Sequence, residues 1–476
     1  MSTQAQANSS FWLHQAVRWW LARPSAVFAL LAAIFGLAAI AGTPPLRGPD
    51  ETAHFLRAYG FAHGQFLATQ TDQEGRKGLF VPAALHVDLD FFNGLRHGPG
   101  HFGSFSKAFA EYARSRDARA AAHTGKPVFW LYEGSEGYSP APYVPAIAAA
   151  AVADIAGLDF LATLYLMRFA GLVANTAIIA YAIARLPCLQ WVVLAIAMLP
   201  ASIYGRAVLS ADGAALAYAL AAMALALEAA VGGANPALSR SLWTMLSALS
   251  KPPQIAFAML EAMTRPWRDW RTHWRAATLA VLPALIACPL WIFLVGGDMG
   301  GWRIYAELPR EHFQAAWKLN FLLMHPLHFP MVLLTSLDAS AGLWQQLIGV
   351  PGWLDTVLHP WAYPVVSALL VGASLERLTA NPPTRRRVAL VAGLTGLAYW
   401  LCVFIIFFIT STPIESERIH GVQGRYFNVM LPLLALVSAA LLPRGLARPY
   451  CAGVATIGAV VSGAALIEAI LRTDWP

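Results

Sequence analysis

Charge is the scarcest property of this 476-residue sequence. Only 12% of the residues are charged and 58% are apolar, whereas soluble domains average about 25% charged and about 45–50% apolar residues. A soluble fold could not cover its surface with so few charges, but a chain embedded in lipid does not need to. The net charge of +7 comes without a long stripe of Lys and Arg, which argues against nucleic-acid binding and favours basic cytoplasmic loops.

Cysteine is almost as scarce. Cys188, Cys288, Cys402 and Cys451 are far apart, lie in or beside apolar stretches and form no C-x-x-C pair. This spacing argues against a disulfide framework and against a zinc site. We interpret the four residues as small apolar side chains in the core.

Long apolar runs are abundant, and a spanning helix needs about 20 such residues. The sequence therefore predicts an all-α polytopic membrane protein of about 10–12 transmembrane helices. The clearest candidate spans are Ala26–Gly42, Leu161–Ala184, Leu189–Tyr204, Ala214–Val231, Ala276–Val295, Ala362–Leu375, Val388–Ile409, Tyr426–Leu442 and Ala452–Ile470. The first run also resembles a secretory signal peptide, but the many apolar segments after it favour an uncleaved helix.

The distribution of Lys and Arg orients these spans. Basic residues that follow the positive-inside rule place four regions in the cytoplasm: the N-terminus at residues 1–25, the run 265–275, the run 377–387 and the segment 444–448. The loop 43–140, the segment 296–360 and the loop 411–425 then lie outside. Residues 26–475 form one membrane domain in this interpretation, and the stretch 50–66 of its first loop has the spacing of an amphipathic helix at the membrane surface.

Two segments permit alternative topologies. Residues 142–158 are short and bounded by proline, and residues 242–263 are interrupted by Lys251-Pro252-Pro253. If the first segment spans the membrane, so does the second. If the first is interfacial, Lys251 lies at the tip of a re-entrant hairpin that enters from the cytoplasm, which places Arg185 and Arg240 inside and Asp212 outside. We slightly favour the second arrangement.

The first candidate site follows the first span. Asp50 and Glu51 are adjacent carboxylates at its outer end, and helical spacing places His54 and then Arg57 on nearby turns. A carboxylate at the membrane face is well placed to act as a general base. The alternative is that Asp50 caps the following helix and Glu51 interacts favourably with its dipole.

The second candidate site is the sequence GVQGRYF at residues 421–427, where the chain enters a late span from outside. Arg425 offers a bidentate fork suited to phosphate, and its flanking glycines would let a ligand approach the backbone. The alternative is an interfacial anchor made by Arg425 and Tyr426. Lys251 is costly inside an apolar stretch and is a further functional candidate, with snorkelling as its alternative, while Asp212 opens an apolar helix and could simply cap it.

These motifs carry a resemblance. The pattern GPDExxHFxRA at residues 48–58, LSAD at 209–212, SKP at 250–252 and GVQGRYF at 421–427 resemble, in this order, a bacterial membrane family catalogued as domain of unknown function 2142. That family in turn resembles the GT-C glycosyltransferases, which pass a sugar from a polyprenyl phosphate to an acceptor outside the cytoplasm. The composition, rich in Ala, Arg and Trp, is typical of a GC-rich bacterium, so we expect the inner membrane and a site that faces the periplasm.

The resemblance implies roles for individual residues. Asp50 matches the acidic base and Glu51 the second acidic position of the GT-C motif, and Arg425 and Lys251 are candidates to bind the donor phosphate. The remaining candidates for substrate binding are His54, Arg57, Gln423, Tyr426 and Asp212. The implied partners are a polyprenyl-phosphate-linked sugar, a glycan or lipid acceptor and the bilayer. No cofactor is required and no metal is predicted, although acidic and histidine side chains could in principle hold a divalent ion.

Other function classes remain open. A lipid-linked sugar flippase or transporter would need polar residues near the middle of the membrane, yet most predicted spans are poor in them. A polymerase or ligase would share the donor type. A non-catalytic protein of envelope-glycan assembly would tolerate neutral residues at positions 50 and 51, and both are acidic here.

Overall fold

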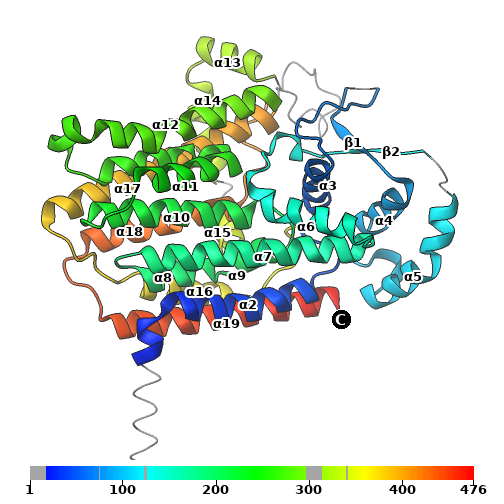
Figure 1. The fold of residues 1–476 in the computed structure, drawn as a ribbon, viewed down its shortest axis with the longest axis horizontal. Coiled ribbons are helices and arrows are strands. Elements are labelled where there is room, and N and C mark those ends of the chain that lie inside the picture. Colours follow the sequence, from blue (N-terminus) through cyan, green and yellow to red (C-terminus); the bar gives the residue numbers. More distant parts are fainter. Residues whose placement is uncertain (1–17, 74, 123–125, 296–313, 339–340) are drawn as a thin grey trace, which may run out of the picture.

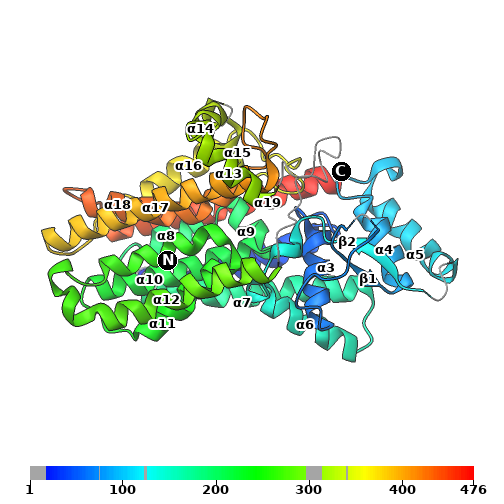
Figure 2. The ribbon, with the colours of Figure 1, turned by 90° about the horizontal axis from the view of Figure 1, so that it is seen from above.

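The computed structural model describes residues 18–73, 75–122, 126–295, 314–338 and 341–476. Its long helices run side by side along the longest axis of the molecule, and a smaller group of short elements caps one end (Figures 1 and 2). That group, which we call the cap, is formed mainly by residues 43–143. Residues 1–17 of the predicted cytoplasmic N-terminus (1–25) and residues 296–313 of the predicted outer segment (296–360) lie outside the described residues.

Within the described part of the chain, seven helical segments are long and apolar enough to cross a membrane, or eight if one bent pair counts as a single span. The seven are α2 (Pro24–Gly42), α7 (Phe160–Arg185), α10 (Asp212–Ala230), η5 with α12 (Trp267–Asp269 and Trp270–Val295), α17 (Pro382–Ser411), η8 with α18 (Gly424–Met430 and Leu431–Leu441) and α19 (Arg448–Asp474). The bent pair is α13 (Ala315–Met324) with α14 (His328–Asp338), at 104°. The all-α polytopic class predicted from the apolar runs is confirmed, but the described residues contain seven or eight candidate spans where about 10–12 were predicted.

Several predicted spans are shorter than expected. The run 189–204 is divided into α8 (Gln190–Ala197) and α9 (Pro200–Ala207), because Pro200 cannot continue the first helix and instead begins the second. Both helices are nearly completely buried in the bundle. The helices α6 (Val144–Ile155) and α16 (Ala362–Ala373) have 12 residues each, about 18 Å, which is too short to cross an apolar layer of about 30 Å.

The interrupted segment forms a hairpin. α11 (Ala237–Ser250) runs toward the capped end of the molecule, and η4 (Pro252–Met263), a 3-10 helix, runs back. Arg240 at the start of α11 binds Glu261 near the end of η4 with an Nε–Oε2 distance of 2.7 Å, so the two ends of the hairpin lie together. Lys251 is at its tip. This geometry agrees with the second of the two topologies considered above.

The region that caps one end has its own core. It contains α3 (Glu51–Ala62), α4 (Ala83–Asn93), α5 (Phe105–Ala122) and short 3-10 turns at Gly100–Phe102, Ser135–Gly137 and Ala141–Tyr143. The short helix α15 (Ala341–Ile348) lies instead in the bundle, against η8, α9 and α16. β1 (Gly78–Val81) pairs antiparallel with β2 (Val128–Leu131), with Gly78 opposite Leu131. The prediction that residues 50–66 form a surface helix was wrong, because α3 is buried on every side, with Phe55, Leu56 and Phe61 in this core.

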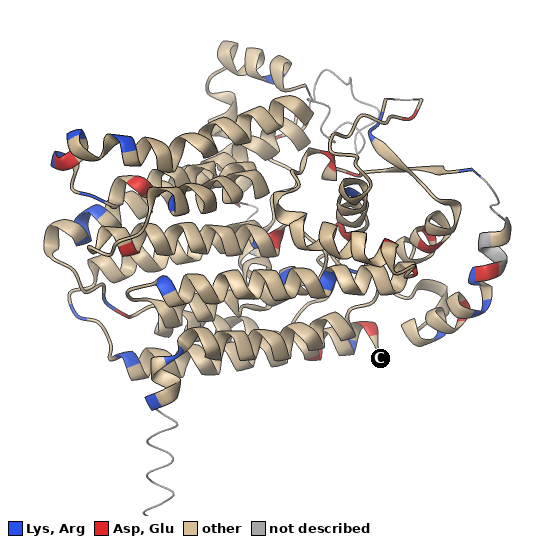
Figure 3. Cartoon of the chain, in the orientation of Figure 1, with Lys and Arg blue, Asp and Glu red and all other residues tan. Residues whose placement is uncertain are grey.

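Basic residues outnumber acidic ones at the opposite end of the molecule, whereas the cap carries both signs. Figure 3 shows Lys and Arg at the ends of the long helices farthest from the cap. They include Arg185 at the end of α7, Arg271 and Arg275 at the start of α12, and Arg385 and Arg387 at the start of α17. The folded chain therefore keeps the charge asymmetry that the loops predicted.

Candidate functional site

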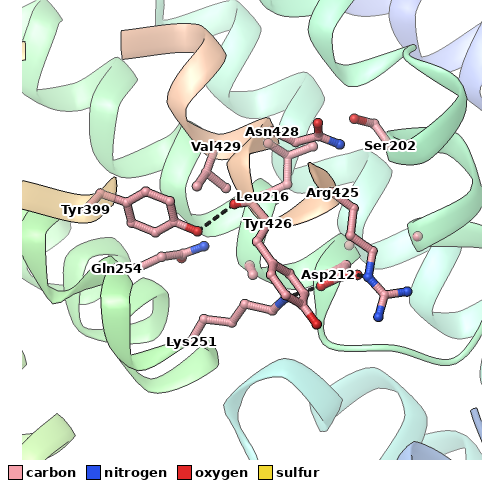
Figure 4. Close-up of a pocket in the computed structure, with 13 residues that line it drawn as sticks. Ser202, Asp212, Leu216, Lys251, Gln254, Tyr399, Arg425, Tyr426, Asn428 and Val429 are labelled. Carbon is pink, nitrogen blue, oxygen red and sulfur yellow. Dashed lines mark hydrogen bonds and ion pairs between the residues drawn. The ribbon is translucent and has the colours of Figure 1, made fainter. Parts of the chain in front are cut away.

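Four charged side chains from distant parts of the sequence meet where the cap joins the bundle. Asp50 precedes α3, Asp212 opens α10, Lys251 is at the hairpin tip and Arg425 begins η8. Lys251 Nζ pairs with Asp212 Oδ1, Arg425 Nε lies 3.5 Å from Asp212 Oδ2, and Arg425 Nη2 lies 3.5 Å from Asp50 Oδ2. Figure 4 shows Asp212 between the two cations. We call these four residues the charged cluster.

Neither aspartate acts as a helix cap. Asp50 occupies the N-cap position of α3, but its side chain makes no capping hydrogen bond and its backbone is left-handed, with φ at 54°. Asp212 is the first residue of α10, and its carboxylate contacts Lys251 and Arg425 instead of the helix amides. The capping alternative is therefore not what the structure contains. A left-handed conformation outside glycine is strained, and such strain concentrates at functional sites.

The four side chains of the charged cluster differ in how far they are exposed to solvent. The Asp50 side chain is 46% exposed, while those of Asp212, Arg425 and Lys251 are 24%, 14% and 13% exposed. Asp50 is thus the acid that an incoming molecule meets first, and the two cations lie behind it. The sum of charges is zero, because two carboxylates face two cations.

Glu51 has different surroundings from those expected of a reacting acid. Its side chain is fully buried and binds Arg168 of α7 through two hydrogen bonds of 2.7 Å. Its oxygens also accept hydrogen bonds from the backbone N–H of Gly48 at 3.0 Å and of Leu209 at 2.8 Å. With its acceptor sites occupied, Glu51 holds the turn that presents Asp50 rather than facing the pockets.

Two arginines complete the support of this turn. Arg168 also donates to the carbonyl oxygens of Thr43 and Pro44, both at 2.8 Å. Arg47, 1% exposed, binds Asp474 of α19 at 3.0 Å and Asp355 at 2.7 Å. Sequence reasoning missed both residues, although an arginine inside an apolar stretch, as at Arg168, is a signal that could have found one.

His54 lies beside the cluster and is held by an aromatic partner. Its Nδ1 is 2.5 Å from the hydroxyl oxygen of Tyr143, and its ring packs edge-on against Tyr138. Burial lowers the pKa of His54 to about 4, against the opposing effect of Asp50 and Asp212, so the imidazole is neutral at physiological pH. It can position a neighbour or accept a hydrogen bond but carries no charge.

Arg57 does not reach the cluster. Its guanidinium donates to the carbonyl oxygens of Tyr138 and Phe66 at 3.0–3.1 Å and lies 4.1 Å from the centre of the Phe61 ring. The structure therefore separates it from the other predicted substrate-binding residues. Its contacts tie together the core of the cap.

Close packing against α15 fixes the position of the GVQGRYF segment, residues 421–427. The Gly424 N–H donates to Oε1 of Gln346 at 2.8 Å, and any side chain at Gly424 would collide with the α15 backbone at Leu343. This close approach sets the start of η8 and hence the direction of Arg425. Tyr426 lies under the cations, with Lys251 Nζ 4.5 Å from its ring centre. Gln423 is half-buried with its Oε1 unpaired among the described residues.

Two pockets meet at the charged cluster, and both are lined by Gly205, Asp212 and Arg425. The bundle pocket extends between the long helices and is further lined by Ser202, Leu216, Lys251, Gln254, Tyr399, Tyr426, Asn428 and Val429 (Figure 4). The loop pocket is further lined by Pro49, Ala201, Tyr204, Val208, Ser210, Gln346, Val350 and Pro351. A ligand at the cluster could thus extend in two directions.

The residues present do not form an obvious metal site. In the part of the chain that is described, no group of three or more His, Cys, Asp or Glu side chains is arranged to hold an ion. Asp50 and Asp212 already face Arg425, and Lys251 would repel a cation. The absence of a metal requirement stays a prediction.

The fold defines the class: a polytopic α-helical membrane protein with a charged cluster and two pockets at one end of its bundle. The family model described as "Predicted membrane protein (DUF2142)" matches residues 33–437. The chain belongs to that family, as its motifs indicated. No curated protein and no solved structure matches it.

Proposed function

We propose that this protein is a membrane glycosyltransferase that transfers a sugar from a polyprenyl-phosphate donor to an extracytoplasmic acceptor. The observation that carries the proposal is the placement of Asp50. A half-exposed carboxylate, free of any capping role, lies 3.5 Å from a nearly buried arginine and beside the Asp212–Lys251 pair. A base next to a cationic clamp is what displacement of a phosphate leaving group requires.

Each residue of the cluster has a role in this mechanism. Asp50 takes the proton of the acceptor hydroxyl as the oxygen attacks the anomeric carbon. The bond from that carbon to the phosphate oxygen breaks, and its electron pair remains on the phosphate, which Arg425 and Lys251 stabilise. One displacement inverts the anomeric configuration. Glu51 acts indirectly, as a positioning residue for Asp50.

Asp212 prepares the cations for the donor. Without substrate it neutralises Lys251 and Arg425, whose burial would otherwise be costly. A phosphate that enters the cluster provides a second anion for the same two groups. Tyr426 lines the bundle pocket beside Lys251 and is a candidate to contact substrate. Gln423 and neutral His54 line neither pocket and are candidates from the sequence alone.

The placement of the basic residues supports an orientation. If the arginine-rich end faces the cytoplasm, as the positive-inside rule requires, the cluster faces the periplasm of a bacterial inner membrane. The apolar donor chain would lie in the bilayer, and the glycan or lipid acceptor would approach from the aqueous side. No cofactor enters this scheme.

A second candidate is movement of a lipid-linked sugar across the bilayer. The observation that favours it is the bundle pocket, where the polar side chains of Gln254 and Asn428 lie among apolar helices. Buried polar groups of this kind also line transport pathways. A non-catalytic role in envelope-glycan assembly is the third possibility.

A transfer assay tests the proposal. Purified protein is incubated with radiolabelled polyprenyl-phosphate sugars, and wild type is compared with Asp50→Asn, Arg425→Ala and the matched control Asp90→Asn, which alters an exposed acid of the cap. We expect transfer by wild type and the control, and a loss of at least about a hundredfold in Asp50→Asn and Arg425→Ala.

Two results would reject the glycosyltransferase. One is that no donor of a broad panel is consumed. The other is that Asp50→Asn transfers sugar as fast as wild type. In either case a flippase assay in proteoliposomes, with the same lipids, decides between transport and a non-catalytic role.

A further inference from the structure

The bundle pocket contains hydrogen-bonding groups that the charged cluster does not use. Ser202 of α9 is 5% exposed and Asn428 of η8 is 6% exposed. Ser202 Oγ and Asn428 Oδ1 have no hydrogen-bond partner among the described residues. More than about nine in ten buried polar groups are paired in folded proteins. Two unpaired polar atoms in one pocket therefore indicate that a ligand or water binds there.

The rest of the wall indicates the chemistry of that partner. Leu216, Val429 and the ring of Tyr426 provide apolar surface, and the lining cations, Lys251 and Arg425, belong to the charged cluster. Tyr399 is already engaged, since its hydroxyl donates to the Tyr426 carbonyl oxygen at 2.6 Å. Neutral hydrogen-bonding groups, an aromatic face and apolar patches suit a hydroxylated ring better than a second phosphate. The pocket as it stands has about 20 Å³ of water-accessible space, so a ring enters only when the walls move apart.

We propose that the bundle pocket is the subsite for the sugar ring of a lipid-phosphate-linked sugar. Ser202 and Asn428 are the residues that form hydrogen bonds with the hydroxyl groups of that ring. The phosphate lies at Arg425, three residues before Asn428 in the same 3-10 helix. η8 thus connects the two halves of one ligand. The ligand class rests on the proposed function, but occupancy of the pocket can be measured without turnover.

The test measures binding rather than transfer. Wild-type protein in nanodiscs is titrated with farnesyl phosphate and with farnesyl phosphates that carry mannose, glucose, galactose or an aminopentose. We expect at least one sugar to tighten binding about tenfold or more over farnesyl phosphate alone. Ser202→Ala and Asn428→Leu should each weaken binding of the glycosylated lipid about five- to tenfold. Both variants should bind farnesyl phosphate itself with the affinity of wild type.

A structural role would give a different result. Because the two polar atoms are unpaired, both variants should melt at or above the wild-type temperature, whereas loss of a structural hydrogen bond would lower it. Thr176→Val is the matched control, since Thr176 of α7 is another unpaired buried hydroxyl but lies outside the pocket. It should leave the sugar-dependent gain intact.

The inference is overturned if no sugar tightens binding in wild type, or if the two variants weaken farnesyl phosphate as much as its glycosylated forms. Failure of the transfer reaction has a separate signature. If the sugar-dependent gain is present but no sugar is transferred, the proposed enzyme is rejected and the subsite belongs to a carrier.

Discussion

Glu51 shows how an acidic residue can be essential to a site without reacting in it. Its carboxylate neutralises the buried Arg168 and accepts two backbone N–H groups. Glu51→Gln keeps the shape but leaves the arginine charge uncompensated. We expect a loss of about 3–5 kcal/mol of stability, seen as a large fall in melting temperature and in the monodisperse peak on size exclusion.

A different result would restore Glu51 as a reacting acid. That result is a Glu51→Gln protein that melts like wild type but transfers no sugar. The double variant Glu51→Gln with Arg168→Met is the control, because removal of both charges should recover part of the lost stability.

His54 makes the stability of the fold depend on pH. Burial lowers the pKa of its imidazole from 6.5 to about 4. Between these pH values the unfolded chain takes up a proton that the folded chain does not, so the folded state loses stability as the pH falls. The full stability is present above pH 6.5, and about 3 kcal/mol is lost by pH 4.

Melting curves from pH 7 to 4 check this expectation. His54→Gln should show a shallower decline than wild type, because its side chain does not titrate. An equal slope in the His54 variant would contradict the assignment.

At the scale of elements, the hairpin of α11 and η4 determines the topology. Its ends are joined by Arg240 and Glu261, so both must lie on one side of the membrane. In a background without native cysteines, Ala234→Cys and Arg268→Cys should react with an impermeant maleimide from the same side. Asp90→Cys, in the cap, should react only from the other side.

Labelling of positions 234 and 268 from opposite sides would show that α11 and η4 cross as one span. Labelling of position 90 from the same side as both would instead overturn the assignment of the cap to the opposite face. The experiment thus separates an error in the hairpin from an error in overall orientation.

Apolar runs predicted the elements well where helices are continuous. α2, α7, α10, α17 and α19 lie where the runs placed them, because a long apolar stretch without proline in its middle has few alternatives in lipid. The division at Pro200, the burial of α3 and the pairing of β1 with β2 could not be predicted in this way. They depend on tertiary packing, which a pattern along the chain does not record.

The individual residues of the site could be predicted from the sequence, but their arrangement in space could not. Asp50, Asp212, Lys251 and Arg425 were each identified as candidates, yet their meeting joins positions up to 375 residues apart. The sequence also left capping open for both aspartates, beside catalysis for Asp50 and beside substrate binding for Asp212, because these roles demand the same residue at the same place. Only the direction of the side chains separates them.

At the scale of the whole molecule, the arginine-rich ends of the long helices and the charged cluster lie at opposite ends of the bundle. The charged cluster, with its pockets, lies at the end where the bundle meets the cap. Such a separation lets one end of the bundle anchor orientation while the opposite end is available for chemistry. The proposed donor and acceptor then reach the cluster from two phases, lipid and water.

The contact of Arg47 with Asp474 has a consequence for biosynthesis. Asp50 leaves the ribosome early, whereas α19, which holds the turn before it through Asp474, is synthesised some 420 residues later. Insertion of α19 is therefore the step that completes the support of Asp50. Until that helix is inserted, the acidic motif is present but not yet fixed in place, so assembly of the site depends on synthesis of α19.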